Sequence, residues 1–403
     1  MGESRSTYHW VKYLSERFDV TLLTLQRADR QEVAEQLPDT HVVTWPEAKL
    51  WRGHERINAM MKPAYIGFYL RARQWLRDNR SAIDLVHQLA PLAMRYPCPA
   101  TGLDIPYIIG PLGGSLAAPK DLNAQRFPGV AMAPVDRWYA RLRAVDHWRF
   151  AHDHWLRRSY AEAAAIIGVG DYVRAHLHDL DIGHFVVESE VGIDDVITRP
   201  EEATDRPVST LLHVARGVRT KGLQEAIQCL ADLYQDYPAL TLISAGDGPE
   251  VDRCQNIAAA LGVADRCQFL GRVPRERVEQ LYLDADIFLF PSVREPSGNV
   301  VFEAMRYGLP PIVADMGGPS QVITDTSGLA VPWRTVAQFR QDLAAGARRL
   351  IDDRPYYQAL VHGAQERVAH LGIWSHKIDR MVALYDQLGC IDRREDQAGG
   401  QAA

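Results

Sequence analysis

Short apolar runs alternate with amphipathic segments along the second half of the chain. The apolar runs are 209–215, 239–246, 267–271, 286–292 and 311–315. Between them, apolar side chains recur at the spacing of a helix face in 223–234, 250–261 and 275–283. Strands that alternate with helices predict right-handed βαβ units, and therefore a parallel sheet covered by helices on both faces.

The first half repeats this alternation more loosely, with apolar runs at 18–25, 83–90, 105–114 and 163–170. The acidic, proline-containing stretch 199–207 has the composition of a linker. We therefore expect an α/β protein with two Rossmann-like domains. The expected units are an N-terminal domain (1–194), a C-terminal domain (195–372), a last helix (373–390) and a disordered tail (391–403).

The beginning of the chain departs from this pattern. Gly2 leads directly into a predicted helix, whereas a doubly wound domain begins with a strand before its first glycine-containing turn. We therefore expect that the first N-terminal strand is missing from this sequence.

Composition narrows the class of protein. The chain has 403 residues, of which 47% are hydrophobic, and this suits two globular domains. No apolar stretch reaches the ~18–20 residues that a membrane helix needs, and the first ten residues lack the apolar core of a signal peptide. The five cysteines are scattered and form no CxxC pair, which disfavours disulfides and a cysteine metal site. The predicted location is the cytoplasm.

Charge is distributed unevenly along the chain. Residues 49–158 contain 17 Lys and Arg against 8 Asp and Glu, although the whole chain has a net charge of −6. Six of the nine tryptophans lie in or near this basic stretch: Trp45, Trp51, Trp75, Trp138, Trp148 and Trp155. Basic residues interleaved with aromatic ones suit peripheral contact with an anionic membrane or a lipid diphosphate. The alternative, equally weighted, is solvated helix faces with tryptophans in the core. Nucleic acid is not a predicted partner, because no binding motif accompanies the charge.

Two glutamates, Glu295 and Glu303, stand eight positions apart. Glu295 follows the predicted strand 286–292, and Glu303 lies on a predicted helix over 299–307. Ligands of an open parallel sheet bind beyond the carboxyl ends of its strands, so both carboxylates would face one crevice. Each can accept two hydroxyl hydrogen bonds, which suits a ligand with a diol at either end, such as a nucleotide sugar. On spacing alone, two unrelated glutamates are the alternative.

The arrangement of strand, Glu295, Pro-Ser-Gly and helix resembles the Glu-x7-Glu motif of family 4 retaining glycosyltransferases, or glycosyl transferases group 1. Arg216 and Lys221 are similar to the family's Arg-x4-Lys-Gly step. Further similar segments are the second strand with its glycine turn (243–250), the segment that meets the base (269–273), the interdomain signature (191–195) and a returning helix that begins near Trp374. The resemblance is closest over 190–390.

This resemblance implies a GT-B enzyme, in which two Rossmann-like domains with parallel sheets face a cleft. The C-terminal domain would bind a nucleotide diphosphate sugar, and the N-terminal domain would bind the acceptor. Glu295 would hold hydroxyls of the donor sugar and Glu303 the ribose, while Arg216 and Lys221 would hold the leaving diphosphate. Glu295, Arg216 and Lys221 form the implied catalytic set. The other implied donor-binding residues are Gly2, Val273, Ser297 and Gly298. The family implies neither a metal nor another cofactor.

The N-terminal half departs from the family at one point. Many relatives have a histidine after the strand that corresponds to 105–110, and here the chain continues as Pro-Leu-Gly-Gly, as in a bacterial subgroup with a Gly-Pro-x-Gly-Gly loop. The acceptor-side candidates are therefore His87, Gly113 and Gly114. A histidine satisfied at a strand end and an ordinary tight turn are the alternatives for these residues. His152 and His154 do not share a helix face, so we expect no metal there.

The predicted function is a retaining glycosyltransferase that moves a hexose-type unit to a cell-envelope or polysaccharide acceptor, glycan or lipid-linked. It would work in the cytoplasm, with peripheral contact at the inner membrane face. Two alternatives stay open. One is a GT-B nucleotide-sugar epimerase, and the other is a catalytically silent GT-B module that binds a nucleotide sugar.

Overall fold

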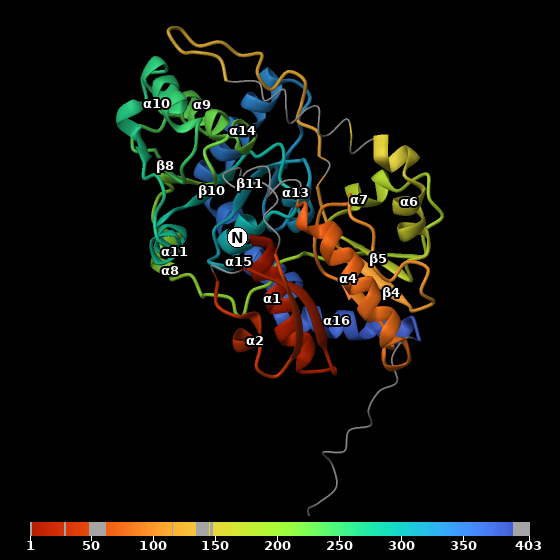
Figure 1. The fold of residues 1–403 in the computed structure, drawn as a ribbon. Helices are drawn as coiled ribbons and strands as arrows, with labels where there is room; N and C mark the ends of the chain where they lie inside the picture. The colour runs from red at the N-terminus through yellow and green to blue at the C-terminus, as the bar shows by residue number, and fades with distance from the viewer. Residues whose placement is uncertain are drawn as a thin grey trace, which may run out of the picture.

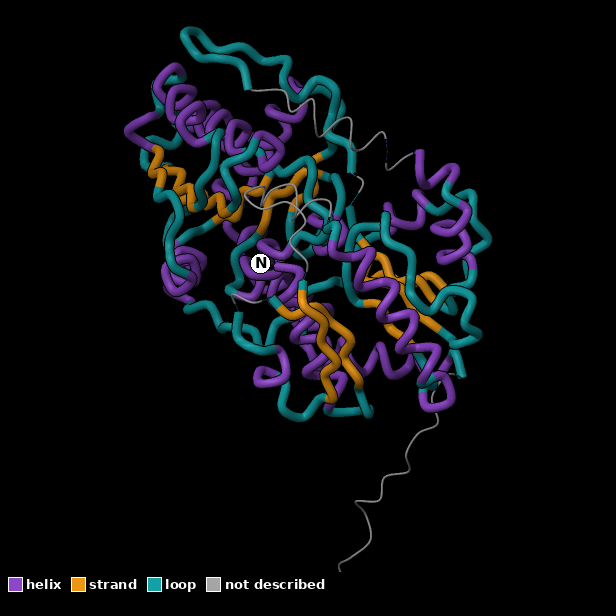
Figure 2. The backbone as a smooth tube through the Cα atoms, viewed as in Figure 1, coloured by secondary structure: helices purple, strands orange, loops and turns teal. Residues whose placement is uncertain are grey.

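The computed structural model describes residues 2–27, 30–47, 62–114, 116–133, 145 and 148–389 (Figure 1). Strands form three parallel sheets, one in the C-terminal half and two in the N-terminal half, and helices surround them (Figure 2). The predicted α/β fold with parallel sheets is confirmed. Residues 391–403, predicted to be disordered, lie outside the described part of the chain, as do Trp51 and Trp138.

The C-terminal sheet has six parallel strands in the order β12-β11-β10-β7-β8-β9. The strands are β7 (Thr210–Val214), β8 (Thr241–Ala245), β9 (Cys267–Phe269), β10 (Ile287–Phe290), β11 (Pro311–Ala314) and β12 (Leu329–Val331). The strand order reverses between β7 and β10, which gives the doubly wound arrangement of a Rossmann fold. The crevice at this switch point is the place where such sheets bind ligands.

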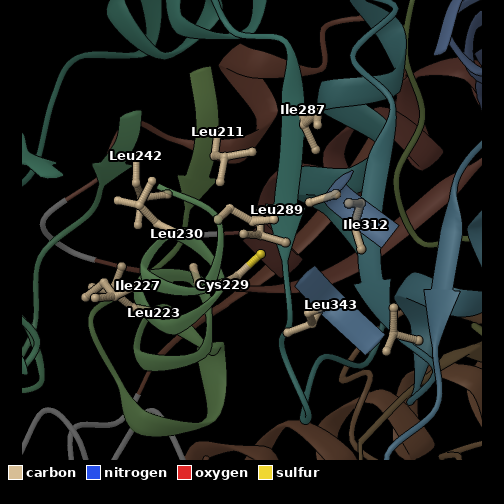
Figure 3. Close-up of a cluster of buried hydrophobic side chains, with 14 of the residues drawn as sticks. Leu211, Leu223, Ile227, Cys229, Leu230, Leu242, Ile287, Leu289, Ile312 and Leu343 are labelled. Atoms are coloured by element: carbon tan, nitrogen blue, oxygen red, sulfur yellow. The ribbon is translucent and has the colours of Figure 1, made fainter. Parts of the chain in front are cut away.

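Helices cover both faces of this sheet. They are α8 (Glu201–Asp205), η2 (Arg219–Lys221), α9 (Leu223–Leu233), α10 (Val251–Ala260), η3 (Ala264–Arg266), α11 (Arg275–Asp284), α12 (Asn299–Arg306), α13 (Gly318–Val322), α14 (Val336–Asp352) and α15 (Arg354–Gly372). On one face, Leu230 of α9 and Leu343 of α14 pack with Leu211, Leu289 and Ile312 of the strands in one buried cluster (Figure 3). The nearly continuous apolar strands follow from burial on both faces.

The N-terminal half contains two separate parallel sheets. The larger has the order β3-β4-β5-β6, and β1 pairs only with β2 among the described residues. The strands are β1 (Thr21–Gln26), β2 (His41–Pro46), β3 (Val86–Gln88), β4 (Tyr107–Leu112), β5 (Ala165–Gly168) and β6 (His184–Val187). The helices are α1 (Gly2–Ser15), α2 (Val33–Gln36), α4 (Ala64–Asp78), η1 (Arg80–Ala82), α6 (His154–Ala161) and α7 (Asp171–His176).

The last helix, α16 (Trp374–Gln387), returns to the N-terminal half. Its apolar face joins a buried cluster with Trp10 of α1 and Ile167 of β5. Lys377 of α16 is fully buried, and its ammonium group donates to Glu188 Oε1 at 2.6 Å. Because a buried charge needs a partner, this ion pair fixes where α16 crosses between the two halves.

Candidate active site

The switch point of the C-terminal sheet carries an ion pair. Lys221 ends the η2 turn that follows β7, and Glu295 follows β10, the neighbouring strand. The Lys221 ammonium group donates to Glu295 Oε2, and the two side chains are 11% and 18% exposed. Two of the three residues in the implied catalytic set therefore meet where an open parallel sheet binds its ligands.

The turn that presents Lys221 is held by close backbone packing. Gly222 has φ of 81°, and a Cβ there would lie 2.3 Å from the carbonyl oxygen of Pro291. Only glycine fits this position. Beneath the turn, His213 of β7 donates from Nε2 to the carbonyl oxygen of Lys221 at 2.9 Å. Burial lowers the pKa of His213 to about 4, so the ring is neutral near pH 7.

The segment after Glu295 is anchored to α13 and leads into α12. The Gly318 amide donates to the carbonyl oxygen of Glu295 at 2.9 Å. Ser297 is buried, and Gly298 has φ of 75° at the N-terminus of α12. A Cβ on Gly298 would lie 3.1 Å from Pro319 Cα, so this turn packs closely against α13.

Glu303 lies on α12, after Glu295 in the sequence, and is not part of the Lys221–Glu295 ion pair. The Tyr282 hydroxyl donates to Glu303 Oε2 at 3.2 Å. Desolvation by the surrounding protein raises the pKa of Glu303, although the residue remains exposed to solvent. The positive charges of Arg275 and Arg5 oppose this increase in pKa. The first turn of α1 therefore lies close enough to Glu303 to act on it.

The remaining donor-side residues occupy different surroundings. Arg216 follows β7 and is exposed, and it makes no ion pair with a described residue. Val273 follows β9 and packs against the buried cluster that contains Tyr282. Gly2 is the first residue of α1, whose N-terminal end lies between the two halves of the molecule (Figure 1).

The glycine loop of the N-terminal half lies directly against the glutamate segment. A Cβ on Gly113 would lie 3.1 Å from Pro296 Cβ. The Tyr172 hydroxyl, at the start of α7, accepts from the Gly114 amide at 3.3 Å and donates to the carbonyl oxygen of Pro296 at 3.1 Å. Tyr172 thus links the predicted acceptor loop to the residue that follows Glu295.

His87 makes hydrogen bonds through both ring nitrogens. Nε2 donates to the carbonyl oxygen of Gly110 at 2.9 Å, and Nδ1 accepts from the Tyr385 hydroxyl at 2.6 Å. Burial lowers the pKa of His87 to about 4. A neutral ring with both nitrogens engaged has the properties of a structural histidine at a strand end. Its predicted acceptor role requires one of these bonds to open.

The described residues contain no group of three or more His, Cys, Asp or Glu side chains placed to hold a metal ion. His152 uses Nδ1 to contact the carbonyl oxygen of Trp148 at 2.9 Å and stacks on its ring. Over all the residues that the structure describes, no helix is both long and apolar enough to cross a membrane.

Three residues of the site have no motif that would have revealed them in the sequence. Tyr172 and His213 contact backbone atoms of the site. Asn299 of α12 donates to Glu190 Oε1 at 3.0 Å, across the interface between the two halves. Only their positions, with His213 near the end of β7 and Tyr172 in the helix that follows β5, could have drawn attention to them.

Comparisons with known proteins agree with this geometry. Residues 197–367 match the family model "Glycosyl transferases group 1". The 2-deoxystreptamine glucosyltransferase of Streptomyces kanamyceticus is 30% identical over 176 residues, which are 43% of this chain and 44% of that protein. The chain thus spans less than half the length of the curated relatives it matches first.

The fold of nearly the whole chain is similar to that of solved structures. Sucrose-phosphate synthase from Thermosynechococcus elongatus superposes with a TM-score of 0.64 at 19% identity, covering 94% of this chain and 91% of that one. HepE from Anabaena, in complex with UDP and glucose, gives a TM-score of 0.57 at 16% identity, with 96% of each chain covered. The fold is GT-B, and residues 197–367 within it match the Glycosyl transferases group 1 family.

Proposed function

We propose that this protein is a retaining glycosyltransferase, which transfers a sugar from a nucleotide diphosphate sugar to a cell-envelope or polysaccharide acceptor. The observation that carries the proposal is the Lys221–Glu295 ion pair at the switch point. The family match over 197–367 supports a transferase, and the UDP and glucose bound by HepE support this class of donor.

Each member of the ion pair suits one part of such a donor. A lysine ammonium group stabilises a diphosphate, and a carboxylate accepts hydrogen bonds from two sugar hydroxyls. Lys221 and Glu295 are partly buried and neutralise each other. Donor binding would exchange this contact for Lys221 with phosphate and Glu295 with the sugar, so neither charge is left unpaired.

The reaction develops negative charge on the leaving diphosphate. The η2 turn and His213 beneath it hold the backbone of Lys221, so the lysine would need only to exchange Glu295 for the diphosphate to stabilise that charge. Arg216 follows the same strand and is exposed, so it is free to reach the other phosphate. In a retaining transfer, a diphosphate oxygen takes the acceptor proton on the face from which it departs. This step requires no protein base, which fits a neutral, fully engaged His87.

The acceptor would enter beside the glycine loop. Gly114 has φ of 107°, and a Cβ on it would meet no atom of a described residue within 4 Å. Open space therefore adjoins a loop that contacts the residue after Glu295. A glycan or lipid-linked hydroxyl that approached there would come close to the sugar held by Glu295.

The test is product formation with a panel of nucleotide diphosphate sugars and membrane-derived glycan acceptors. Release of nucleoside diphosphate that requires acceptor, together with an unchanged anomeric configuration in the product, is the expected result. Release without acceptor would favour the epimerase. Donor binding without any product from any acceptor would favour the silent module, and inversion at the anomeric carbon would overturn the retaining mechanism.

The outer surface of the N-terminal half supports peripheral contact with an anionic membrane. Ile66 and Leu70 of α4 are 70% and 62% exposed, and they share a helix face with Tyr69 and Arg73. Trp155 of α6 donates to the Tyr69 hydroxyl at 2.7 Å and lies under the guanidinium group of Arg73. Apolar, aromatic and basic side chains are thus contiguous, as on surfaces that dock at a lipid interface.

This contact is tested by sedimentation with phosphatidylglycerol vesicles and with phosphatidylcholine vesicles. Replacing Ile66 and Leu70 by serine should reduce binding to the anionic vesicles, and binding should also fall with salt. Glu35→Gln, on α2, is the matched exposed control. Equal sedimentation with both lipids, or with neither, would contradict the docking surface.

A further inference from the structure

Residues 116–133, which follow the glycine loop, belong to the N-terminal half by sequence but lie on the C-terminal domain. We call this segment the clasp. In Figure 1 it is the orange loop that runs over the top of the C-terminal domain, past α9 and α10. The clasp lies outside the 197–367 family match.

One end of the clasp is fixed by Asp121. Its Oδ1 accepts from Trp333 Nε1 at 2.9 Å, and its Oδ2 accepts from the Val336 amide, the first residue of α14, at 2.8 Å. Both carboxylate oxygens therefore have a partner in the C-terminal domain. Charged hydrogen bonds of this kind are stronger than neutral ones, particularly at a helix N-terminus.

The centre of the clasp enters the C-terminal core. Leu122 is 5% exposed and belongs to the buried cluster of that domain, and Phe127 and Val130 pack against the same cluster. Polar contacts extend this attachment, since Gln125 accepts from Gln224 at 3.1 Å and the carbonyl oxygen of Ala131 accepts from Arg253 at 2.9 Å. The clasp is thus packed into the domain as well as resting on its surface.

The clasp also contacts the turn that carries Lys221. Arg219 lies two residues before Lys221, in the same η2 turn. Its guanidinium group donates to the carbonyl oxygen of Leu122 and, at 3.2 Å, to Asn123 Oδ1. It also forms a bidentate pair with Glu225 at 2.6 and 2.8 Å, and both side chains of this pair are buried.

We infer that Asp121 and Arg219 are positioning residues, through which the clasp holds the turn that presents Lys221. Asp121 fixes the clasp on α14, the clasp fixes Arg219, and Arg219 fixes the turn. This inference rests on the proposed function, because it assigns the clasp to the diphosphate side of that site. At its other end, the clasp begins at Leu116, whose Cδ1 would lie 2.7 Å from a Cβ on Gly317. One segment therefore contacts both the Lys221 turn and the surroundings of Glu295.

The inference is tested by a double-mutant cycle on nucleoside diphosphate affinity. UDP, GDP and ADP are titrated into the wild-type protein by calorimetry, and the tightest ligand is then used with every variant. Asp121→Ala should weaken binding about 3- to 10-fold, as expected for the loss of hydrogen bonds that act indirectly. In a Lys221→Ala background, the same change should have little further effect, because the group it positions is gone.

Three variants separate positioning from general destabilisation. Lys120→Ala, an exposed neighbour on the clasp, should bind like the wild type. Asn123→Ala, which removes a contact to Arg219 without touching α14, should reproduce part of the loss. Arg219→Lys should bind nucleoside diphosphate more weakly than the wild type, since lysine cannot contact Glu225, Leu122 and Asn123 together.

Hydrogen exchange of the 217–224 segment gives a readout that does not depend on ligand. Asp121→Ala should speed exchange there, and Lys120→Ala should not. Equal losses of affinity for Asp121→Ala in the wild-type and Lys221→Ala backgrounds, or unchanged exchange over 217–224, would overturn the inference. If the wild type binds none of the three nucleotides, the proposed function fails, and the exchange result alone decides whether the clasp holds the turn.

Discussion

The two sides of the candidate site, which we call its walls, are built differently. The C-terminal wall presents charged side chains, Lys221 and Glu295, at the ends of adjacent strands. The N-terminal wall presents backbone, at Gly113 and Gly114, and its one candidate histidine, His87, is fully hydrogen-bonded. Under the proposed function, the donor side would therefore recognise its ligand by charge, and the acceptor side by shape and backbone groups.

This difference is consistent with the chemistry that each wall would perform. A diphosphate is the same in every donor, so fixed cations serve it, whereas acceptors differ and need an adaptable surface. The Tyr172 hydroxyl joins the two walls directly, because it bonds both Gly114 and Pro296. The predictions below separate the roles of the two walls.

The largest effect is expected at Lys221. Removing one preorganised charge from a developing anion costs roughly 3 kcal/mol in the transition state, or about a hundredfold in rate. Lys221→Ala should therefore reduce turnover by about this factor, while circular dichroism and cooperative unfolding show that the fold is retained. Turnover equal to that of the wild type would remove Lys221 from the donor site.

The next largest effect on ligand binding distinguishes the roles of Glu295 and Glu303. Glu303→Ala should weaken both nucleotide sugar and free nucleoside diphosphate by the ~1.5–3 kcal/mol that a charged hydrogen bond contributes. Glu295→Ala should leave nucleoside diphosphate affinity nearly unchanged and lose turnover and sugar discrimination, because its hydroxyl partners are absent from that ligand. Calorimetry of both variants with both ligands measures this. Equal loss of nucleoside diphosphate affinity in both would contradict the division.

A smaller effect is expected at the junction of the walls. Tyr172→Phe removes one bond to Gly114 and one to Pro296, which should lower the free energy of unfolding by about 1–2 kcal/mol. Nucleoside diphosphate affinity should not change, because neither bond involves the Lys221 turn. Tyr234→Phe is the control, since its hydroxyl makes no hydrogen bond with a described residue. A loss of affinity in Tyr172→Phe would show that the two walls are not separable.

The smallest effect concerns pH and Glu303. Its pKa in the folded protein is raised above the ordinary 4.5, so ionising it opposes folding. The neutral carboxyl group of Glu303 therefore favours the folded state. This contribution to stability is fully present below the pKa of the unfolded chain and is lost as pH rises through the pKa of the folded protein. Glu303→Gln should therefore raise the melting temperature slightly at pH 7 and leave it unchanged near pH 4. The gain is small because solvent reaches the residue. Glu276→Gln, exposed on α11, should show neither change, and a lower melting temperature for Glu303→Gln at pH 7 would contradict the raised pKa.

Sequence patterns predicted the C-terminal domain in detail, because its strands are buried on both faces and its site lies at strand ends. The helix predicted over 299–307 is α12, Asn299–Arg306, and the predicted strand at 311–315 is β11. The prediction missed β2, β6 and β12, which are edge strands with largely exposed or half-exposed side chains. Half-exposed edge strands lack the continuous apolar run that marks a buried one.

The site was only partly predictable, for a physical reason. Lys221 belongs to one motif of fixed spacing, and Glu295 and Glu303 to another, so both are visible in the sequence as patterns. Tyr172 and Asp121 act on backbone atoms of residues that are distant along the chain. A contact of this kind places no constraint on neighbouring residues, so no local pattern records it.

The central claim is that a nucleotide diphosphate sugar binds across the switch point and replaces the Lys221–Glu295 contact. The most direct test is a crystal structure of the protein with its best-binding nucleotide sugar. We predict that Lys221 Nζ lies within hydrogen-bonding distance of a phosphate oxygen, and that Glu295 accepts from hydroxyls of the sugar. A bound nucleotide sugar that leaves the Lys221–Glu295 ion pair intact would contradict the account.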